Sequence, residues 1–87
     1  MIFGRLARRI RVFPNPFSVQ TTLKTNFELN RANIVILDSF GRKIKQMKNV
    51  SEQTITFNRN GLPSGIYFLF VTEKSKMQAT GKMVIIE

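Results

Sequence analysis

Residue types on which enzymes and metal sites depend are missing or scarce in this sequence. It contains no Cys, no His and no Trp, and only five of its 87 residues are acidic. The absence of Cys excludes disulfides and thiolate metal sites, and the absence of His removes the commonest general base and metal ligand. The acids are too widely spaced for a carboxylate pair or an oxygen cage: Glu28, Asp38, Glu52, Glu73 and Glu87. We therefore expect a protein that is not an enzyme and holds no cofactor or metal.

Basic residues are abundant by contrast, and the formal net charge is +9. Four of the fourteen basic residues lie within the first eleven positions: Arg5, Arg8, Arg9 and Arg11. Residues 12–87 carry ten basic and five acidic groups, which leaves a net charge of +5. Such a chain suits an anionic partner, such as nucleic acid, a membrane surface or an acidic glycolipid, unless its lysines simply face solvent. Because the aromatic residues accompany aliphatic ones and not Lys or Arg, we expect no nucleic-acid site.

The length allows one domain with a thin core, preceded by a short basic segment. We predict that residues 1–11 form a disordered leader or linker remnant, with at most one or two helical turns over residues 2–10. Residues 12–87 are predicted to form the domain. In Met1–Val12 the basic residues interrupt the apolar ones, an order unlike that of a secretory signal. No run reaches the roughly 18 apolar residues of a membrane span, so we expect no export leader in this chain.

The clearest structural signal is an alternation between Ser18 and Leu29. One face of this segment carries six residues, and the residues between them form the other face: Val19, Thr21, Leu23, Thr25, Phe27 and Leu29. A period of two sustained over this length predicts a half-buried β-strand. Before it, Pro14 and Pro16 predict an extended segment over residues 12–17.

Five further short strands follow, separated by turns. They are expected at residues 33–38, 42–48, 54–58, 66–72 and 79–86. Asp38 and Gly41 suit a tight turn between the first two. The second of these strands, with Ile44 inward, suits a sheet edge because lysines hold its outward positions: Lys43, Lys45 and Lys48. The sequence therefore predicts an all-β protein, an immunoglobulin-like antiparallel β-sandwich of about seven short strands.

Three features near the C-terminus allow more than one interpretation. The strand at residues 66–72 is apolar on both faces, so one face is either covered by the segment around Phe13 or is a docking surface. Tyr67 suits a core aromatic whose hydroxyl reaches the rim of the sheet. Lys82 either extends from a sheet rim over apolar neighbours or belongs to a terminal strand that pairs with the sheet edge of another protein.

Four segments occur in an order that resembles a known family. They are Pro14-Asn15-Pro16 after an aromatic residue, Asp38-x-x-Gly41 between two strands, LPSGIYF at Leu62–Phe68, and KMVI at Lys82–Ile85. No single motif is specific, but their order over residues 12–87 resembles the type A C-terminal sorting domain of the type IX secretion system, also called the Por secretion system.

The resemblance implies a non-catalytic secretion signal at the end of a large cargo protein in a Gram-negative bacterium. Cargo of this family passes through the periplasm to the outer membrane and the cell surface, or to the extracellular space. The outer-membrane translocon recognises the folded domain, and a sortase cleaves it off to release the cargo or join it to anionic lipopolysaccharide. Translocon and sortase proteins are thus the expected partners, with contact to lipopolysaccharide also implied. The N-terminal cargo domain is expected to be absent from this chain.

By the same resemblance, seven residues are expected to serve recognition by the translocon or sortase: Pro14, Asn15, Pro16, Gly65, Tyr67, Lys82 and Val84. Gly65 and Tyr67 match the GxY motif of the family, and Lys82 begins its terminal Lys-apolar strand. Gly81 departs from the family, which often has a second basic residue there. The alternative function is a stand-alone immunoglobulin-like module that binds carbohydrate or protein, for which Phe40 is the clearest loop-tip aromatic.

Overall fold

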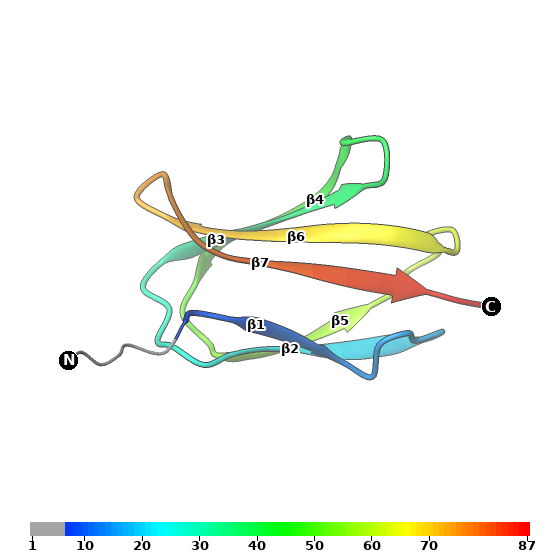
Figure 1. The fold of residues 1–87 in the computed structure, drawn as a ribbon, viewed down its shortest axis with the longest axis horizontal. Coiled ribbons are helices and arrows are strands. Elements are labelled where there is room, and N and C mark those ends of the chain that lie inside the picture. The colour runs from blue at the N-terminus through cyan, green and yellow to red at the C-terminus, as the bar shows by residue number, and fades with distance from the viewer. Residues whose placement is uncertain (1–6) are drawn as a thin grey trace.

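The computed structural model describes residues 7–87, which form seven β-strands (Figure 1). The strands are β1 Ile10–Phe13, β2 Gln20–Thr25, β3 Ala32–Asp38, β4 Lys43–Val50, β5 Thr54–Asn58, β6 Gly65–Glu73 and β7 Lys76–Ile85. No helix in this part of the chain is long and apolar enough to cross a membrane. The predicted all-β class is confirmed.

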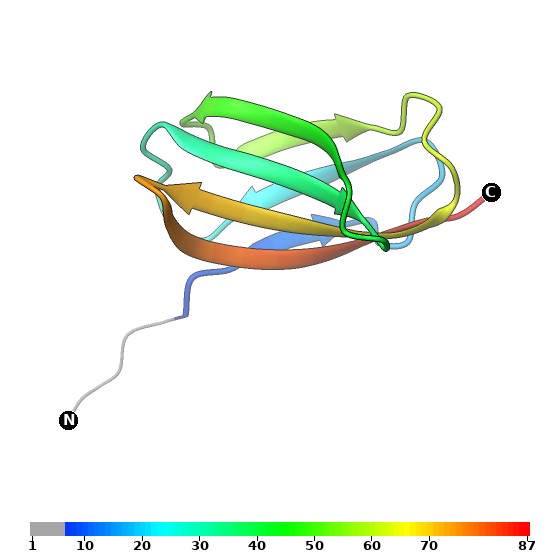
Figure 2. The ribbon, with the colours of Figure 1, turned by 90° about the horizontal axis from the view of Figure 1, so that it is seen from above.

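The strands form two antiparallel sheets that pack face to face. One sheet has the order β1-β2-β5 and the other has the order β4-β3-β6-β7. In Figure 1 the four-stranded sheet lies above the three-stranded one, and Figure 2 shows the molecule from above. The most apolar strand, β6, is interior to its sheet, and the Lys-rich strand β4 forms an edge, as predicted. The expectation of an immunoglobulin-like β-sandwich is confirmed.

The core lies between the two sheets and is built from alternate residues of facing strands. Its completely buried aliphatic side chains include Leu23 from β2, Ile34 and Ile36 from β3, and Leu69 and Val71 from β6. Each of these strands places every second residue inward, since successive side chains of a strand point to opposite faces. The sandwich therefore forms from the period-two pattern of the sequence.

Strand β1 corrects the predicted leader. Ile10 and Arg11, which the sequence assigned to a disordered segment, form the first half of β1, and Ile10 is buried in the core. The predicted helical turn is wrong over residues 7–10, because the chain there runs into a strand. The side chain of Asn26 holds the backbone just before β1 with hydrogen bonds of 2.7 and 2.9 Å. The rest of the predicted leader, residues 1–6, lies outside the described residues.

Strand β2 is shorter than the alternating pattern predicts. It ends at Thr25, whose hydroxyl donates to the backbone oxygen of Phe27 at 2.8 Å and so supports a bend. Val19, predicted on the buried face, precedes the strand and is 71% exposed. Leu29 is buried as predicted, but from the connection to β3 and not from β2.

The edge strand β4 differs from the prediction at Lys45. Its register with β3 shifts between Ile36 and Leu37, which leaves Ile44 as an extra residue and places Lys45 opposite Ile36. Lys45 therefore lies on the core side of the edge, and its Nζ is 5.4 Å from the centre of the Phe57 ring. A positive charge over an aromatic face at this distance is favourable.

Candidate functional site

The segments that carry the predicted recognition residues meet at one end of the sandwich, where β6 begins, β7 ends and the C-terminus emerges (Figure 1). Three parts of the chain meet there: residues 14–17, which we call the proline segment, the start of β6 and the end of β7. Gly65 pairs with Ile85 across β6 and β7, and Phe17 forms a parallel bridge to the same Ile85. We call this meeting point the junction.

The proline segment closes the outer edge of β7 with four hydrogen bonds. Asn15 accepts from the Val84 N–H through Oδ1 at 2.8 Å and donates from Nδ2 to the Lys82 oxygen at 3.0 Å. Phe17 donates to the Val84 oxygen at 3.0 Å and accepts from the Ile86 N–H at 2.8 Å. One amide side chain and one residue of backbone therefore satisfy the edge of β7, as an added strand would do.

The packing of Phe17 anchors this contact. Its ring is buried and meets the Phe57 ring edge-to-face at 6.4 Å between centres. The buried Thr21 hydroxyl donates to the Pro14 oxygen at 2.6 Å, which ties the segment to β2 as well. Both Phe13–Pro14 and Asn15–Pro16 are cis peptide bonds. The proline segment is thus fixed to both sheets.

This arrangement decides against one interpretation of the terminal strand. A partner strand cannot pair with β7 over Lys82–Ile86 while Asn15 and Phe17 hold that edge. Strand addition there requires the proline segment to leave.

Arg59 is a central residue of the junction that the sequence analysis missed. Its Nε donates to the Leu62 oxygen at 2.7 Å, and one terminal nitrogen donates to the oxygens of Ser18 and Ile86 at 3.2 and 3.0 Å. The other terminal nitrogen donates to the Ser64 hydroxyl at 3.2 Å. The planar guanidinium presents its donors in a fixed fork, so one side chain joins the chain after the proline segment, the loop before β6 and the C-terminus.

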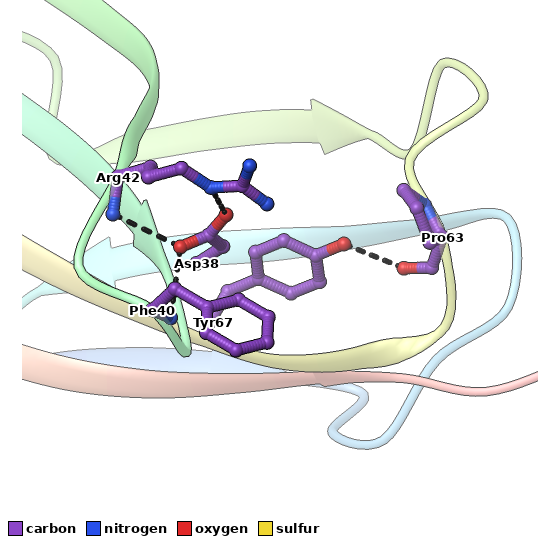
Figure 3. A network of polar contacts seen from close by, with 5 residues as sticks. All are labelled: Asp38, Phe40, Arg42, Pro63 and Tyr67. Atoms are coloured by element: carbon purple, nitrogen blue, oxygen red, sulfur yellow. Dashed lines mark hydrogen bonds and ion pairs between the residues drawn. The ribbon is translucent and has the colours of Figure 1, made fainter.

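Tyr67 is a core residue of this end of the molecule. Its side chain is 4% exposed, and its hydroxyl donates to the Pro63 oxygen at 2.6 Å (Figure 3). This is the core aromatic with a rim hydroxyl that the sequence predicted. Gly65 begins β6 with a φ of +157°, and the ring of Tyr67 lies 4.0 Å from where a Cβ on it would stand. Tyr67 and Gly65 therefore position the loop before β6.

Lys82 and Val84 point away from the core, on the outer face of the four-stranded sheet. In the register of β6 with β7, Lys82 lies beside Phe68 and Val84 beside Ile66. Lys82 is exposed and Val84 is half-buried. Lys82 is the one charged residue among the seven predicted residues, and its side chain is accessible to a partner.

The turn between β3 and β4 lies at the same end of the sandwich (Figure 3). The Asp38 carboxylate accepts hydrogen bonds from the N–H groups of Phe40 and Arg42, both at 2.9 Å, and pairs with the Arg42 guanidinium at 2.8 Å. The backbone N–H of Arg42, then its side chain and the N–H of Phe40, lower the pKa of Asp38. Between this turn and the loop before β6 is an open hollow of about 230 Å³, lined in part by Tyr67 and Ile66.

The site contains hydrogen bonds, packed aromatics and lysines, and no recognisable catalytic set. Among residues 7–87, no group of three His, Cys, Asp or Glu side chains lies close enough to hold a metal ion. The hydrogen bonds of the junction fix the proline segment to the end of β7, and Lys82 presents an exposed charge beside it.

Comparison with known proteins extends this result. One solved structure similar to the chain comes from a study of PorZ, described as an essential bacterial surface component of the type IX secretion system of Porphyromonas gingivalis. It shares 23% sequence identity with a TM-score of 0.72, over 90% of this chain and 11% of that protein. The likeness shows the shared fold, and the chain spans about a ninth of that protein's length. No curated protein matches the sequence. Residues 11–87 match the family described as the secretion system C-terminal sorting domain, so the chain belongs to the type IX C-terminal sorting domains.

Proposed function

We propose that this domain is the part of a secreted protein that the type IX translocon recognises at the outer membrane, and that a sortase then separates from its cargo. Membership of the family implies secretion to the cell surface or the extracellular space and interaction with the type IX machinery. Recognition by the translocon, passage through the periplasm, cleavage by the sortase and transfer of the cargo to lipopolysaccharide are the finer steps of the proposal.

The observation that carries the proposal is the junction. Residues far apart in sequence, Asn15, Gly65 and Val84, meet at one end through backbone pairing and the two hydrogen bonds of the Asn15 side chain. A machine that inspects this end would therefore sense whether the domain has folded, because the junction joins a segment near the start of the domain to the end of β7. Such a check suits a translocon that recognises the folded domain.

The cleavage step of this proposal needs a site outside the folded domain. Strand β1 begins at Ile10 and is buried there, and Asn26 holds the backbone of residues 7 and 9. A protease needs an extended, accessible backbone, which the residues paired in β1 do not offer. Cleavage is therefore expected before Ile10.

The test is surface delivery of a reporter in a bacterium with a working type IX system. The full chain is fused behind a signal peptide and a reporter, and compared with the same reporter without the chain and with a strain that lacks the translocon. We expect reporter on the surface only when both the chain and the translocon are present. Equal delivery without the chain, or without the translocon, would contradict the proposal.

A further inference from the structure

The outer face of the four-stranded sheet is unusually apolar. In the register of β3, β6 and β7, outward-facing apolar residues lie side by side on neighbouring strands. We call them the outer patch: Val35, Leu37, Ile66, Phe68, Phe70 and Val84. Ile66 and Phe68 are 44% and 38% exposed, and the other four are half-buried. Since the solvent face of an antiparallel sheet is normally polar, a contiguous apolar patch indicates an interaction surface.

The structure settles whether another part of the chain covers this face. Phe13, the cover that one of the two sequence interpretations assigned to this strand, lies in β1 of the opposite sheet and is itself 40% exposed. In Figure 2 the four strands lie nearest the viewer, in front of β1, β2 and β5. Within residues 7–87, the outer patch is therefore open to a partner.

The charged groups that border the outer patch have one sign. A row across the sheet contains Lys43, Leu37, Phe68 and Lys82, so that a lysine stands at each end of two apolar residues. The four strands contain two carboxylates, Asp38 and Glu73. Asp38 alternates inward and bonds Arg42, and Glu73, at the far end of β6, accepts from the Asn30 N–H at 2.7 Å. The partner must therefore bring the negative charge.

At the end of the sheet where Ile66, Phe68 and Val84 lie, the sheet edges are poor places for a partner. The proline segment holds the edge of β7 over residues 82–86, and the lysines and shifted register of β4 protect the other edge. A partner of the folded domain therefore docks on the face, where side chains and not backbone groups make the contact.

From this geometry we infer that the outer patch is the docking surface for a protein of the type IX machinery, one with an apolar centre bordered by carboxylates. The inference rests on the proposed function and names the surface that serves it. An apolar, aromatic centre with a charged rim is the usual anatomy of a protein interface, and Phe68, between Leu37 and Lys82, occupies the place of its central anchor.

Two other occupants fit less well. A second copy of the chain would bring Lys43 and Lys82 against further lysines, with no carboxylate on the face to pair them. A lipid surface is entered by side chains that reach well below the headgroups, whereas Ile66 and Phe68 lie in a flat row and are more than half covered. A folded protein surface suits a flat patch best.

The first test uses charge and size changes in the reporter fused to the full chain. Phe68→Glu and Lys82→Glu are each expected to reduce surface delivery about tenfold or more, since loss of a central anchor or reversal of a bordering charge weakens binding by that order. Phe68→Leu should keep most of the surface delivery, because Leu keeps an apolar side chain at this position. Lys24→Glu is the matched control, because Lys24 is exposed on β2 of the other sheet and undergoes the same charge change. Circular dichroism on each purified variant confirms that it is folded.

The second test identifies the occupant. Phe68 is replaced by the photo-crosslinking amino acid benzoylphenylalanine, and the exposed Val19 serves as the control position. Irradiation of secreting cells should join position 68, and not position 19, to one type IX protein with carboxylates around the crosslinked surface. A lipid adduct, or a dimer of this chain alone, overturns the inference.

The outcomes also separate the inference from the proposed function. If the folded variants Phe68→Glu and Lys82→Glu are delivered like the unchanged chain, while the reporter without the chain is not, the outer patch is not the docking surface and the proposed function stands. If the reporter without the chain is delivered equally well, the proposed function itself fails.

Discussion

Replacing Asn15 by Ala tests whether the junction holds the domain together. The change removes the side-chain amide that accepts from Val84 N–H and donates to the Lys82 oxygen. Each such hydrogen bond contributes about 0.5–1.5 kcal/mol net, so we expect the free energy of unfolding to fall by about 1–3 kcal/mol. In a domain of this size each kcal/mol lowers the Tm by about 4–8 °C. The loss is a large share of the stability typical of a small domain, about 5–15 kcal/mol.

Asn26→Ala is the matched control. Asn26 also makes two hydrogen bonds from its amide to backbone, of 2.7 and 2.9 Å, but its partners lie just before β1. Bonds to residues 7 and 9, which precede β1 and can open without separating the two sheets, contribute little to global stability. We therefore expect a loss below about 0.5 kcal/mol for Asn26→Ala, although the same atoms are removed.

The assay is urea unfolding followed by the fluorescence of Tyr67, the single Tyr of the chain, in a protein without Trp. Hydrogen exchange adds a local measurement, since the Val84 amide should lose protection in Asn15→Ala and keep it in Asn26→Ala. Equal losses of stability in the two variants, or an unchanged Val84 amide in Asn15→Ala, would refute the view that the proline segment clamps β7.

Three further results follow from the same structure. Arg59→Ala should lower the free energy of unfolding by about 2–4 kcal/mol in urea titrations, because four hydrogen bonds are lost. Arg59→Lys should recover less than half of that loss, because the Lys ammonium lacks the planar, forked donors of the guanidinium. Gly81→Ala should lower the free energy of unfolding by about 1–3 kcal/mol, since the new Cβ would stand 3.0 Å from the Ile10 side chain and 3.3 Å from the Leu69 side chain. Thermal unfolding measures this change, and an unchanged Tm would show that β1 moves aside freely. Asp38 has a lowered pKa, so its contribution to stability is present above about pH 4 and is lost as the pH falls through the lower pKa of the folded state. Asp38→Asn should remove that part of the acid dependence. Parallel curves of the free energy of unfolding against pH for the two proteins would contradict this prediction.

The sequence predicted the elements whose signals are local. The alternation of Thr21, Leu23 and Thr25 placed β2, because side chains of a strand alternate between faces. The turn at Asp38–Gly41 and the strand β5 at Thr54–Asn58 were also predicted where they occur. Turn chemistry and strand period act over a few residues, so they are visible without a partner.

The errors arose where the partner is distant. Ile10 lies in a basic segment, and only its pairing with Thr25 in β2 makes it part of a strand. Lys45 turned to the core side because β4 shifts register against β3. The basic charge of the leader and of β4 is visible in the sequence, but the register that decides where each side chain points is not.

For the candidate site, too, the sequence indicated several residues but not the contacts between distant ones. The family resemblance indicated Asn15, Gly65, Tyr67 and Lys82 from motif order alone. It did not indicate the contact that joins Asn15 to β7, or the place of Arg59 among the backbone oxygens around it. The sequence near Arg59 gives no sign of two of its four partners, because Ser18 and Ile86 are 41 and 27 residues away along the chain.

What the sequence determined by itself is the β class, the absence of His and Cys and the family resemblance, because composition, period and motif order need no neighbours. The tertiary structure alone decided that the proline segment covers the edge of β7 and that Phe68 and Lys82 remain open on the outer face. Both outcomes depend on which strands lie side by side and in which register, and these are properties of the whole folded chain.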